Sequence, residues 1–361
     1  MTQTLPKRCR TPFFRPMTLL PLLAGWPLSL PAQVPEIREG AAVPRDVREV
    51  YDAGIRYLVA NQADDGSWPG GQQGPGVTGM ALMVLLASGE DPNFGLYSQP
   101  IRRALQSILT SQDQSTGYLG PSMYHHGFAT LALAEAYGVV DERRLWDGAS
   151  DTSRTGSAGR PGIGEALELA VRCSLTAQRK NPLGGWRYSP EATDADTSVS
   201  GAVLVGLLAA RNAGIEVPDE AIDRGIAYLQ SMTSGDGQVA YSGGMGMGDS
   251  LARSSIAALC FQVARRTDLP QAQATGDYIA GQRDAGGNQH YAGYTEYYQA
   301  QAMFQADAEA WQAWNRSLVR RLKTMQRSDG SFPGSFGGAA STSLYLLALA
   351  VNYRFLPIYE R

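Results

Sequence analysis

The chain has few cysteines and no long runs of like charge. Only three cysteines occur in 361 residues, and none has the Cys-x-x-Cys or other spacing typical of metal and redox motifs. The 31 basic and 34 acidic residues are interspersed, and the isoelectric point is about 5.7, which argues against nucleic acid as a partner. A hydrophobic content of 43% is enough for a large core, so disorder of the whole chain is excluded.

The N-terminal segment lacks a hydrophobic run long enough to cross a bilayer. Four basic residues within positions 7–15 precede an apolar run at 17–30, which contains two prolines and is followed by the small residue Ala32. This pattern predicts a secretory signal peptide over residues 1–32 and a linker over 33–44, with a permanent anchor as the alternative. We therefore expect export to the periplasm or the exterior, and no membrane span in the mature chain.

Two cysteines remain after removal of this segment, which carries Cys9 away. An oxidising compartment would allow Cys173 and Cys260 to form a disulfide. Both lie inside apolar stretches with helical character, so two separate buried thiols are the preferred interpretation.

One unit recurs along the chain. A helix ending in an aliphatic pair and Gln is followed by a Gly-rich turn with an aromatic residue, and then by an alanine-rich helix. The interval from 141 to 162 is polar and rich in Gly and Ser, and is predicted to be a surface loop insertion. Six copies can be placed, 44 to 66 residues apart, with landmarks at Gln62, Gln112, Gln178, Met232, Gln282 and Gln326.

The two helices of each unit differ in polarity. The first is amphipathic and the second is apolar on nearly every side, as at 201–208, so the second must be enclosed by other helices. Six such pairs close most simply as an all-α, α6/α6 toroid over residues 45–361, with an inner and an outer ring. An open solenoid is the alternative, but the apolar segment after Val351 lacks a polar cap and is expected to pack on the first repeat.

The turns between the paired helices have a shared chemistry. Gly66, Gly185 and Gly330 are predicted to adopt the left-handed conformation that ends a helix. The Gln side chain of each unit can satisfy backbone groups left without partners at the turn.

These turns carry a specific resemblance. Gln62-x3-Gly66-Ser67-Trp68 and Gln326-x3-Gly330-Ser331-Phe332 resemble the QW repeat of squalene and oxidosqualene cyclases. The repeat is shared more loosely with protein prenyltransferase β subunits, and the whole chain resembles the exported prenyltransferase/squalene-oxidase-repeat proteins of planctomycete bacteria. The resemblance covers about residues 45–361 and implies the α/α toroid fold of the terpenoid cyclases.

An acidic motif bears on the chemistry that this resemblance implies. Cyclases of this kind use Asp-x-Asp-Asp with the middle Asp as general acid, and Asp194 and Asp196 match the first two acids while Thr197 replaces the third. Loss of one carboxylate weakens the case for a shared proton. The alternatives are that Asp196 or Thr197 caps a helix, or that Asp194, Asp196 and Glu191 hold a divalent cation.

Other chemistries of the superfamily are not supported. Zinc-dependent prenyltransferases need an Asp two residues before the zinc-binding Cys, whereas Val171 precedes Cys173 and Ala258 precedes Cys260. Neither cysteine lies in the Gly-Cys-Gly-Glu-Gln motif of thioester domains. We expect no cofactor, apart from the divalent cation just mentioned.

Several polar and aromatic residues stand at or just before the starts of the expected inner helices. In a closed ring these starts surround one mouth, so the residues could converge there to form a ligand site, although capping and packing are the alternatives. They are Tyr124, His125, His126, Asp249, Arg253, His290, Tyr294, Glu296, Tyr297 and Tyr298.

The sequence thus predicts an exported binding module whose mouth takes an isoprenoid, a glycan or a protein partner. A divergent terpenoid cyclase with Asp196 as acid and Asp194 orienting it is one alternative. A carbohydrate-active lyase or hydrolase with a site at the same mouth is another.

Overall fold

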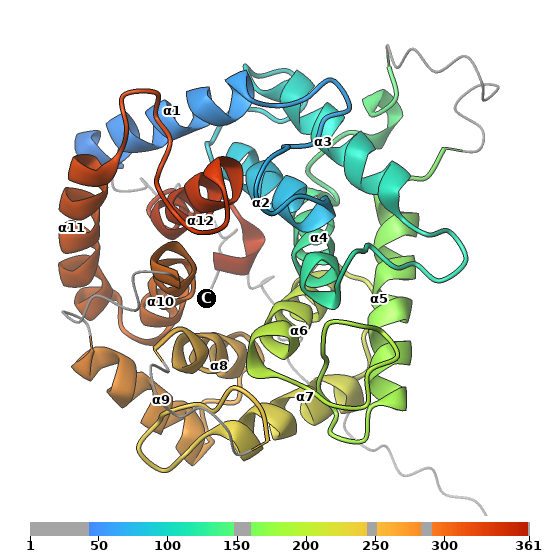
Figure 1. Cartoon of the computed structure of the whole chain (residues 1–361), viewed down its shortest axis with the longest axis vertical. Coiled ribbons are helices and arrows are strands. Elements are labelled where there is room, and N and C mark those ends of the chain that lie inside the picture. Colours follow the sequence, from blue (N-terminus) through green and yellow to red (C-terminus); the bar gives the residue numbers. More distant parts are fainter. Residues whose placement is uncertain (1–42, 148–159, 244–250, 283–290, 360–361) are drawn as a thin grey trace, which may run out of the picture. The chain divides into compact units, whose positions relative to one another are not determined.

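The apolar helix of each repeat lies in an inner ring, where other helices enclose it (Figure 1). The computed structural model describes residues 43–147, 160–243, 251–282 and 291–359. Within these residues nearly every position of α2 and α4 is buried, as expected of helices without a polar face. The inner ring consists of α2 (Pro75–Leu86), α4 (Met123–Ala136), α6 (Thr197–Asn212), α8 (Leu251–Val263), α10 (Ala292–Ala306) and α12 (Gly338–Ala350).

The amphipathic helices form an outer ring around it. In α3, for example, Ile101, Leu105 and Ile108 are fully buried against the inner helices, while the opposite face is partly exposed. The outer ring consists of α1 (Arg45–Ala60), α3 (Ser98–Ser111), α5 (Ile163–Lys180), α7 (Asp219–Met232), α9 (Pro270–Gly281) and α11 (Ala308–Met325).

Both rings close on themselves. Helix α12 packs on α2, and α11 packs on α1. The side-chain Nε2 of Gln326 donates a hydrogen bond to the carbonyl of Val50 at 2.9 Å, and Lys323 pairs with Glu49 at 3.0 Å. The predicted α6/α6 toroid is confirmed, and an open solenoid is not the structure.

In four of the six repeats, one glutamine side chain joins the repeat to the next. The Nε2 of Gln178 donates to the carbonyl of Gly184 in its own turn at 2.8 Å and to the carbonyl of Ala221 in the next outer helix at 2.9 Å. The two bonds tie the turn of the third repeat to the outer helix of the fourth. The same pair of bonds is made by Gln62, Gln112 and Gln326.

The turn glycines allow the close approach of neighbouring repeats. Gly66 and Gly330 have positive φ, as predicted, but in the third repeat Gly184 rather than Gly185 takes this conformation. The reason for the shift is that Gly184 directly follows the turn begun by Asn181, whose carbonyl accepts the Gly184 N–H.

The C-terminal segment closes the toroid at the end opposite to the inner-helix N-termini. Its 3-10 helix η3 (Pro357–Tyr359) lies at the centre of the ring and contacts α6 (Figure 1). The backbone N–H of Ile358 donates to Glu135 near the end of α4. Packing on the first repeat, as expected from the sequence, is made by Tyr353, whose ring lies 4.7 Å from that of Tyr51.

Some sequence-based expectations concern residues outside the described part of the chain. The predicted signal peptide and most of the linker fall there, as does 148–159 of the predicted insertion, whose start forms the short helix η1 (Glu142–Arg144). Cys173 and Cys260 are both buried and unpaired, as predicted. None of the described helices has the length and hydrophobicity to cross a membrane.

A pair of glycine substitutions tests the close approach at the turns. Gly117 and Gly138 both have positive φ, but a Cβ at Gly117 would lie 2.1 Å from the Leu169 carbonyl oxygen, whereas none of the neighbouring atoms lies within 4 Å of a Cβ at Gly138. Gly138→Ala should cost about 1 kcal/mol from backbone strain alone. Gly117→Ala should cost about 2 kcal/mol more, because α3 and α5 must separate. Equal losses in urea unfolding would contradict this account.

Candidate functional site

A cavity of about 410 Å³ opens at the mouth where the six inner helices begin. Each inner helix contributes to it with residues of its first turns, such as Val77 of α2 and Leu344 of α12. The C-terminal η3 lies inside the ring at the other end, so the mouth is the open end of the toroid. A cavity of this size is typical of small-molecule sites.

The wall of the cavity is aromatic and mostly uncharged. Among the lining residues that the structure describes there is no Asp or Glu, and Arg253 alone carries a full charge. Arg253 also donates from Nε to the Val239 carbonyl at 2.8 Å. The aromatic residues of the wall are Tyr124, Phe128, Tyr188, Tyr241, Tyr291, Tyr294 and Phe336.

Four of the residues predicted at the mouth line this cavity: Tyr124, His125, Arg253 and Tyr294. The rings of Tyr124 and Tyr294 lie 6.0 Å apart and join α4 to α10 across the ring. Only 7% of the His125 surface is exposed, and its Nδ1 has no hydrogen-bond partner. Burial lowers the pKa of His125 below its usual value, so the imidazole is neutral at pH 7.

His126 points away from the cavity, which corrects its predicted position. Its Nδ1 accepts the backbone N–H of Leu119, and its Nε2 contacts the Ala170 carbonyl and the Ser174 hydroxyl at 3.1 and 3.0 Å. Burial lowers the pKa of His126 to about 4. Adjacent residues of a helix face about 100° apart, so only one of the two histidines can reach the cavity.

Glu296, Tyr297 and Tyr298 are also displaced from the predicted site. Glu296 faces the outer ring and pairs with Arg321 of α11 at 2.6 Å. Tyr297 and Tyr298 are buried behind the wall, with ring centroids 4.7 Å apart and Phe128 in contact with both. Consecutive residues of helix α10 point about 100° apart, so they cannot all face the cavity. Asp249 and His290 lie outside the described residues.

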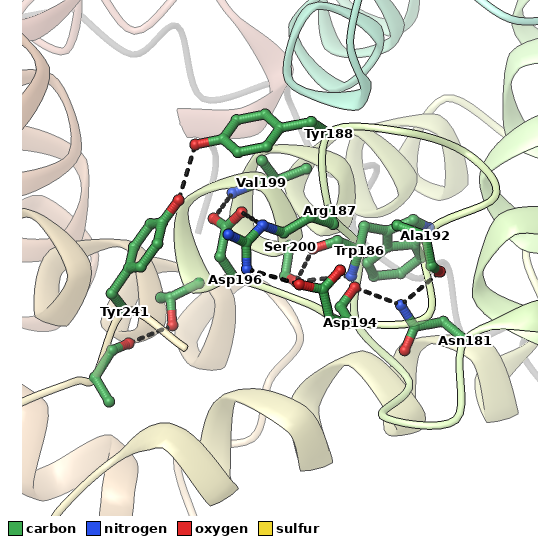
Figure 2. A network of polar contacts seen from close by, with 12 residues as sticks. Asn181, Trp186, Arg187, Tyr188, Ala192, Asp194, Asp196, Val199, Ser200 and Tyr241 are labelled. Carbon is green, nitrogen blue, oxygen red and sulfur yellow. Dashed lines mark hydrogen bonds and ion pairs between the residues drawn. The ribbon is translucent and has the colours of Figure 1, made fainter. Parts of the chain in front are cut away.

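The two acids of the predicted motif are joined by one arginine (Figure 2). The guanidinium of Arg187 lies 3.1 Å from Asp194 and 3.4 Å from Asp196. Asp194 is mostly exposed, whereas the Asp196 side chain is fully buried. Asp196 caps α6, because its Oδ1 accepts the N–H of Val199 at 2.9 Å. The capping interpretation of Asp196 is therefore confirmed.

Two tyrosines lie over the arginine and separate it from the cavity. The hydroxyls of Tyr188 and Tyr241 are 2.8 Å apart (Figure 2), and the guanidinium lies 5.6 and 5.4 Å from their ring centroids. Thr197, which stands in place of the third acid, donates its hydroxyl to Ala240 and its N–H to Tyr241. Thr197 thus fixes the loop that carries Tyr241.

This arrangement limits what Asp196 can do chemically. Burial raises the pKa of Asp196 to about 6, while the Val199 N–H and Arg187 act in the opposite direction. A carboxyl with such a pKa can be protonated in mildly acidic solution. It does not line the cavity, however, although Ser198 and Val199 do, and general acid catalysis needs the acid within hydrogen-bond reach of the reacting group.

A divalent cation on this motif is not supported either. Arg187 already occupies the space between Asp194 and Asp196, and Glu191 lies 4.0 Å from Lys180. Across the described part of the chain, no group of three or more His, Cys, Asp or Glu residues is arranged to hold a metal ion.

A family model with the description "Domain of unknown function (DUF6288)" matches residues 48–342. The chain belongs to this family. The match spans most of the toroid, from α1 into α12. No curated protein is similar to this DUF6288 protein in sequence.

Solved structures share the fold of the DUF6288 chain. An inactive variant of the α-1,6-mannanase GH76A of Salegentibacter sp. HEL1_6, in complex with α-1,6-mannotetrose, has a TM-score of 0.61 at 10% identity, covering 86% of this chain and 99% of the other. The type II terpene cyclase MstE from Scytonema has a TM-score of 0.57 at 15% identity, covering 87% and 100%. These similarities establish the α/α toroid fold of the DUF6288 chain.

Several residues of the cavity wall were not predicted from the sequence. Phe128 lies one helical turn after Tyr124, so the helical period could have indicated it. Tyr188, Tyr241 and Phe336 come from loops that precede inner helices. Their direction depends on hydrogen bonds between distant loops, which no local pattern reveals.

Substitution of Asp196 tests its role as a cap. Asp196→Asn keeps a capping oxygen and removes a buried charge. The folded pKa of about 6 exceeds the unfolded value of about 3.9. The stability of the parent should therefore fall as pH rises from about 4 to about 6, and stay level above that.

The variant should lose this dependence and be at least as stable as the parent at pH 7.5, by up to about 3 kcal/mol. Asp196→Ala, which lacks a capping atom, should be less stable than Asp196→Asn by about 1 kcal/mol. Urea unfolding at pH 4, 5, 6 and 7.5 measures both effects. Marked destabilisation of Asp196→Asn at pH 7.5 would show instead that the charge pair with Arg187 dominates.

Proposed function

We propose that this protein is a ligand-binding toroid in which a small molecule occupies the mouth cavity. The observation that carries the proposal is the cavity itself, whose described wall is aromatic and uncharged apart from Arg253. Large, rigid aromatic faces bind the apolar faces of ligands without losing much conformational entropy. Asp196 has a structural task as a cap, so the proposal does not require catalysis.

The chemistry of the wall fits an isoprenoid or a sugar. Among proteins with this fold, one structure contains a mannotetrose and another contains geranylgeranyl dihydroxybenzoate. The carbohydrate-active alternative needs two carboxylates flanking the scissile bond, and the described lining residues include none. We therefore favour binding over glycoside hydrolysis for this cavity.

A divergent terpenoid cyclase is the second candidate, because one observation favours it. Burial holds the pKa of Asp196 near 6, in the direction that a proton-donating acid needs. Movement of the Tyr188–Tyr241 pair would be required to bring this carboxyl to the cavity. Incubation with polyprenyl substrates and their epoxides, with product analysis by mass spectrometry, tests this candidate: a cyclic product that is lost in Asp196→Asn would replace the binding proposal.

Export is part of the proposal, since it rests on the N-terminal sequence. The four basic residues, the apolar run and Ala32 support cleavage after residue 32. N-terminal sequencing of the protein recovered from its producing cells would give a start near Gln33 if this is correct.

Removal of one wall aromatic should weaken ligand binding without loss of fold. Tyr291 lies on the rim of the cavity and 45% of its surface is exposed. Tyr291→Ala should reduce affinity roughly three- to tenfold, as expected for the loss of one aromatic contact. Calorimetric titration with geranylgeraniol and with mannotriose measures this effect.

The matched control is Tyr137→Ala. Tyr137 ends α4 at the opposite end of the toroid and is 36% exposed, so its substitution should leave affinity unchanged. Equal losses in the two variants, or no binding of either probe by the parent, would contradict a small-molecule site in this cavity.

A further inference from the structure

The main chains of Tyr188 and Tyr241 are fixed in the cavity wall by hydrogen bonds to two inner helices. The carbonyl of Tyr188 accepts the backbone N–H of Met123 at the start of α4, and the carbonyl of Tyr241 accepts that of Thr197 at the start of α6, both at 2.9 Å. These bonds fix the backbone but not the rings, which can still rotate about their Cα–Cβ bonds. Tyr188 is also half exposed. The direction of the rings therefore depends on their side-chain contacts.

These contacts centre on Arg187. Its guanidinium lies 5.6 Å from the ring centroid of Tyr188 and 5.4 Å from that of Tyr241, within the range of an attractive cation–π contact. The two hydroxyls are 2.8 Å apart and share a hydrogen bond, so each ring also restrains the other. The arginine and the two tyrosines thus form one unit (Figure 2).

Arg187 is itself held by two carboxylates. Its guanidinium lies 3.1 Å from Asp194 and 3.4 Å from Asp196, and only 26% of its side chain is exposed. Asp196 is fixed as the cap of α6, and the side chain of Asn181 donates to the carbonyl of Asp194 at 2.8 Å. The position of the guanidinium is therefore set by α6 and by the loop that precedes it.

We infer that Arg187 is a positioning residue of the mouth cavity: it orients the rings of Tyr188 and Tyr241 and thereby sets the affinity of the cavity for its ligand. The inference rests on the proposed function and adds to it a residue behind the wall. Both tyrosines line the cavity, whereas Arg187 does not. Arg187 therefore acts on a ligand through the two rings.

The shape of the guanidinium matters for this role. It is a broad planar group that can bind carboxylates with its edge and aromatic rings with its face, whereas the lysine ammonium is a compact point charge. Arg187→Lys keeps a positive charge beside Asp194 and Asp196 but loses the group that reaches both rings and both carboxylates together. We expect this variant to bind geranylgeraniol or mannotriose at least fivefold more weakly than the parent in calorimetric titration.

Arg266→Lys is the matched control. Arg266 also bridges two carboxylates, Asp223 at 2.8 Å and Asp268 at 3.5 Å. It follows the C-terminus of α8, at the end of the toroid opposite to the mouth, and does not line the cavity. The same substitution should therefore leave the affinity for both probes unchanged.

A double-mutant cycle tests whether Arg187 acts through the rings. In a protein that carries Tyr188→Leu and Tyr241→Leu there is no ring left to orient, so the addition of Arg187→Lys should change affinity less than twofold. In the Tyr291→Ala background, which lacks a ring at the start of α10, Arg187→Lys should keep its full effect. A purely structural role of Arg187 would give the same loss in the two backgrounds.

The outcomes separate this inference from the proposed function. Equal losses in the two backgrounds, or an unchanged affinity in Arg187→Lys itself, would overturn the positioning role and leave the proposed cavity function standing. A loss in Arg266→Lys as large as that in Arg187→Lys would do the same. Failure of the parent to bind either probe would overturn the inference and the proposed function together.

Discussion

Four outer helices, α1, α3, α5 and α11, are followed by a glutamine whose amide nitrogen donates to two carbonyls, one in its own turn and one in the next helix of the outer ring. The two bonds fix the angle and spacing between neighbouring repeats, because both acceptors belong to rigid backbone. In the last repeat the second acceptor is the Val50 carbonyl of α1, so the same interaction that propagates the ring also closes it. The inner ring, and with it the cavity, depends on this closure.

Closure gives the two ends of the toroid different properties. All six inner helices begin at one end, which concentrates their positive N-termini around the cavity. At the other end the C-terminal segment lies inside the ring and packs against α4 and α6. A ligand that enters at the mouth therefore meets one wall. Among the described residues this wall offers aromatic faces, backbone N–H groups, one arginine and one neutral histidine.

The acidic motif has a structural role here, in contrast to the catalytic role that the sequence resemblance implies. Asp194 and Asp196 stand just before and at the start of the inner helix α6. Arg187 neutralises both carboxylates, and Asp196 is used as a helix cap under the Tyr188–Tyr241 pair. Thr197 holds the loop of Tyr241 where a third acid would otherwise stand. Neither acid of the motif therefore lines the cavity.

The sequence by itself determined the six repeats, the division into amphipathic and apolar helices, and hence the closed α/α toroid, because these follow from local periodicity and from the need to bury apolar faces. It also indicated which end of the inner helices carries the polar residues, and Tyr124, His125, Arg253 and Tyr294 do line the cavity. Only the tertiary structure decided that His125 faces inward and His126 outward, that Gly184 rather than Gly185 makes the third turn, and that Asp196 is buried. The reason is that a rotation of one residue along a helix, about 100°, changes what a side chain meets, and that rotation is set by packing between repeats far apart in the chain.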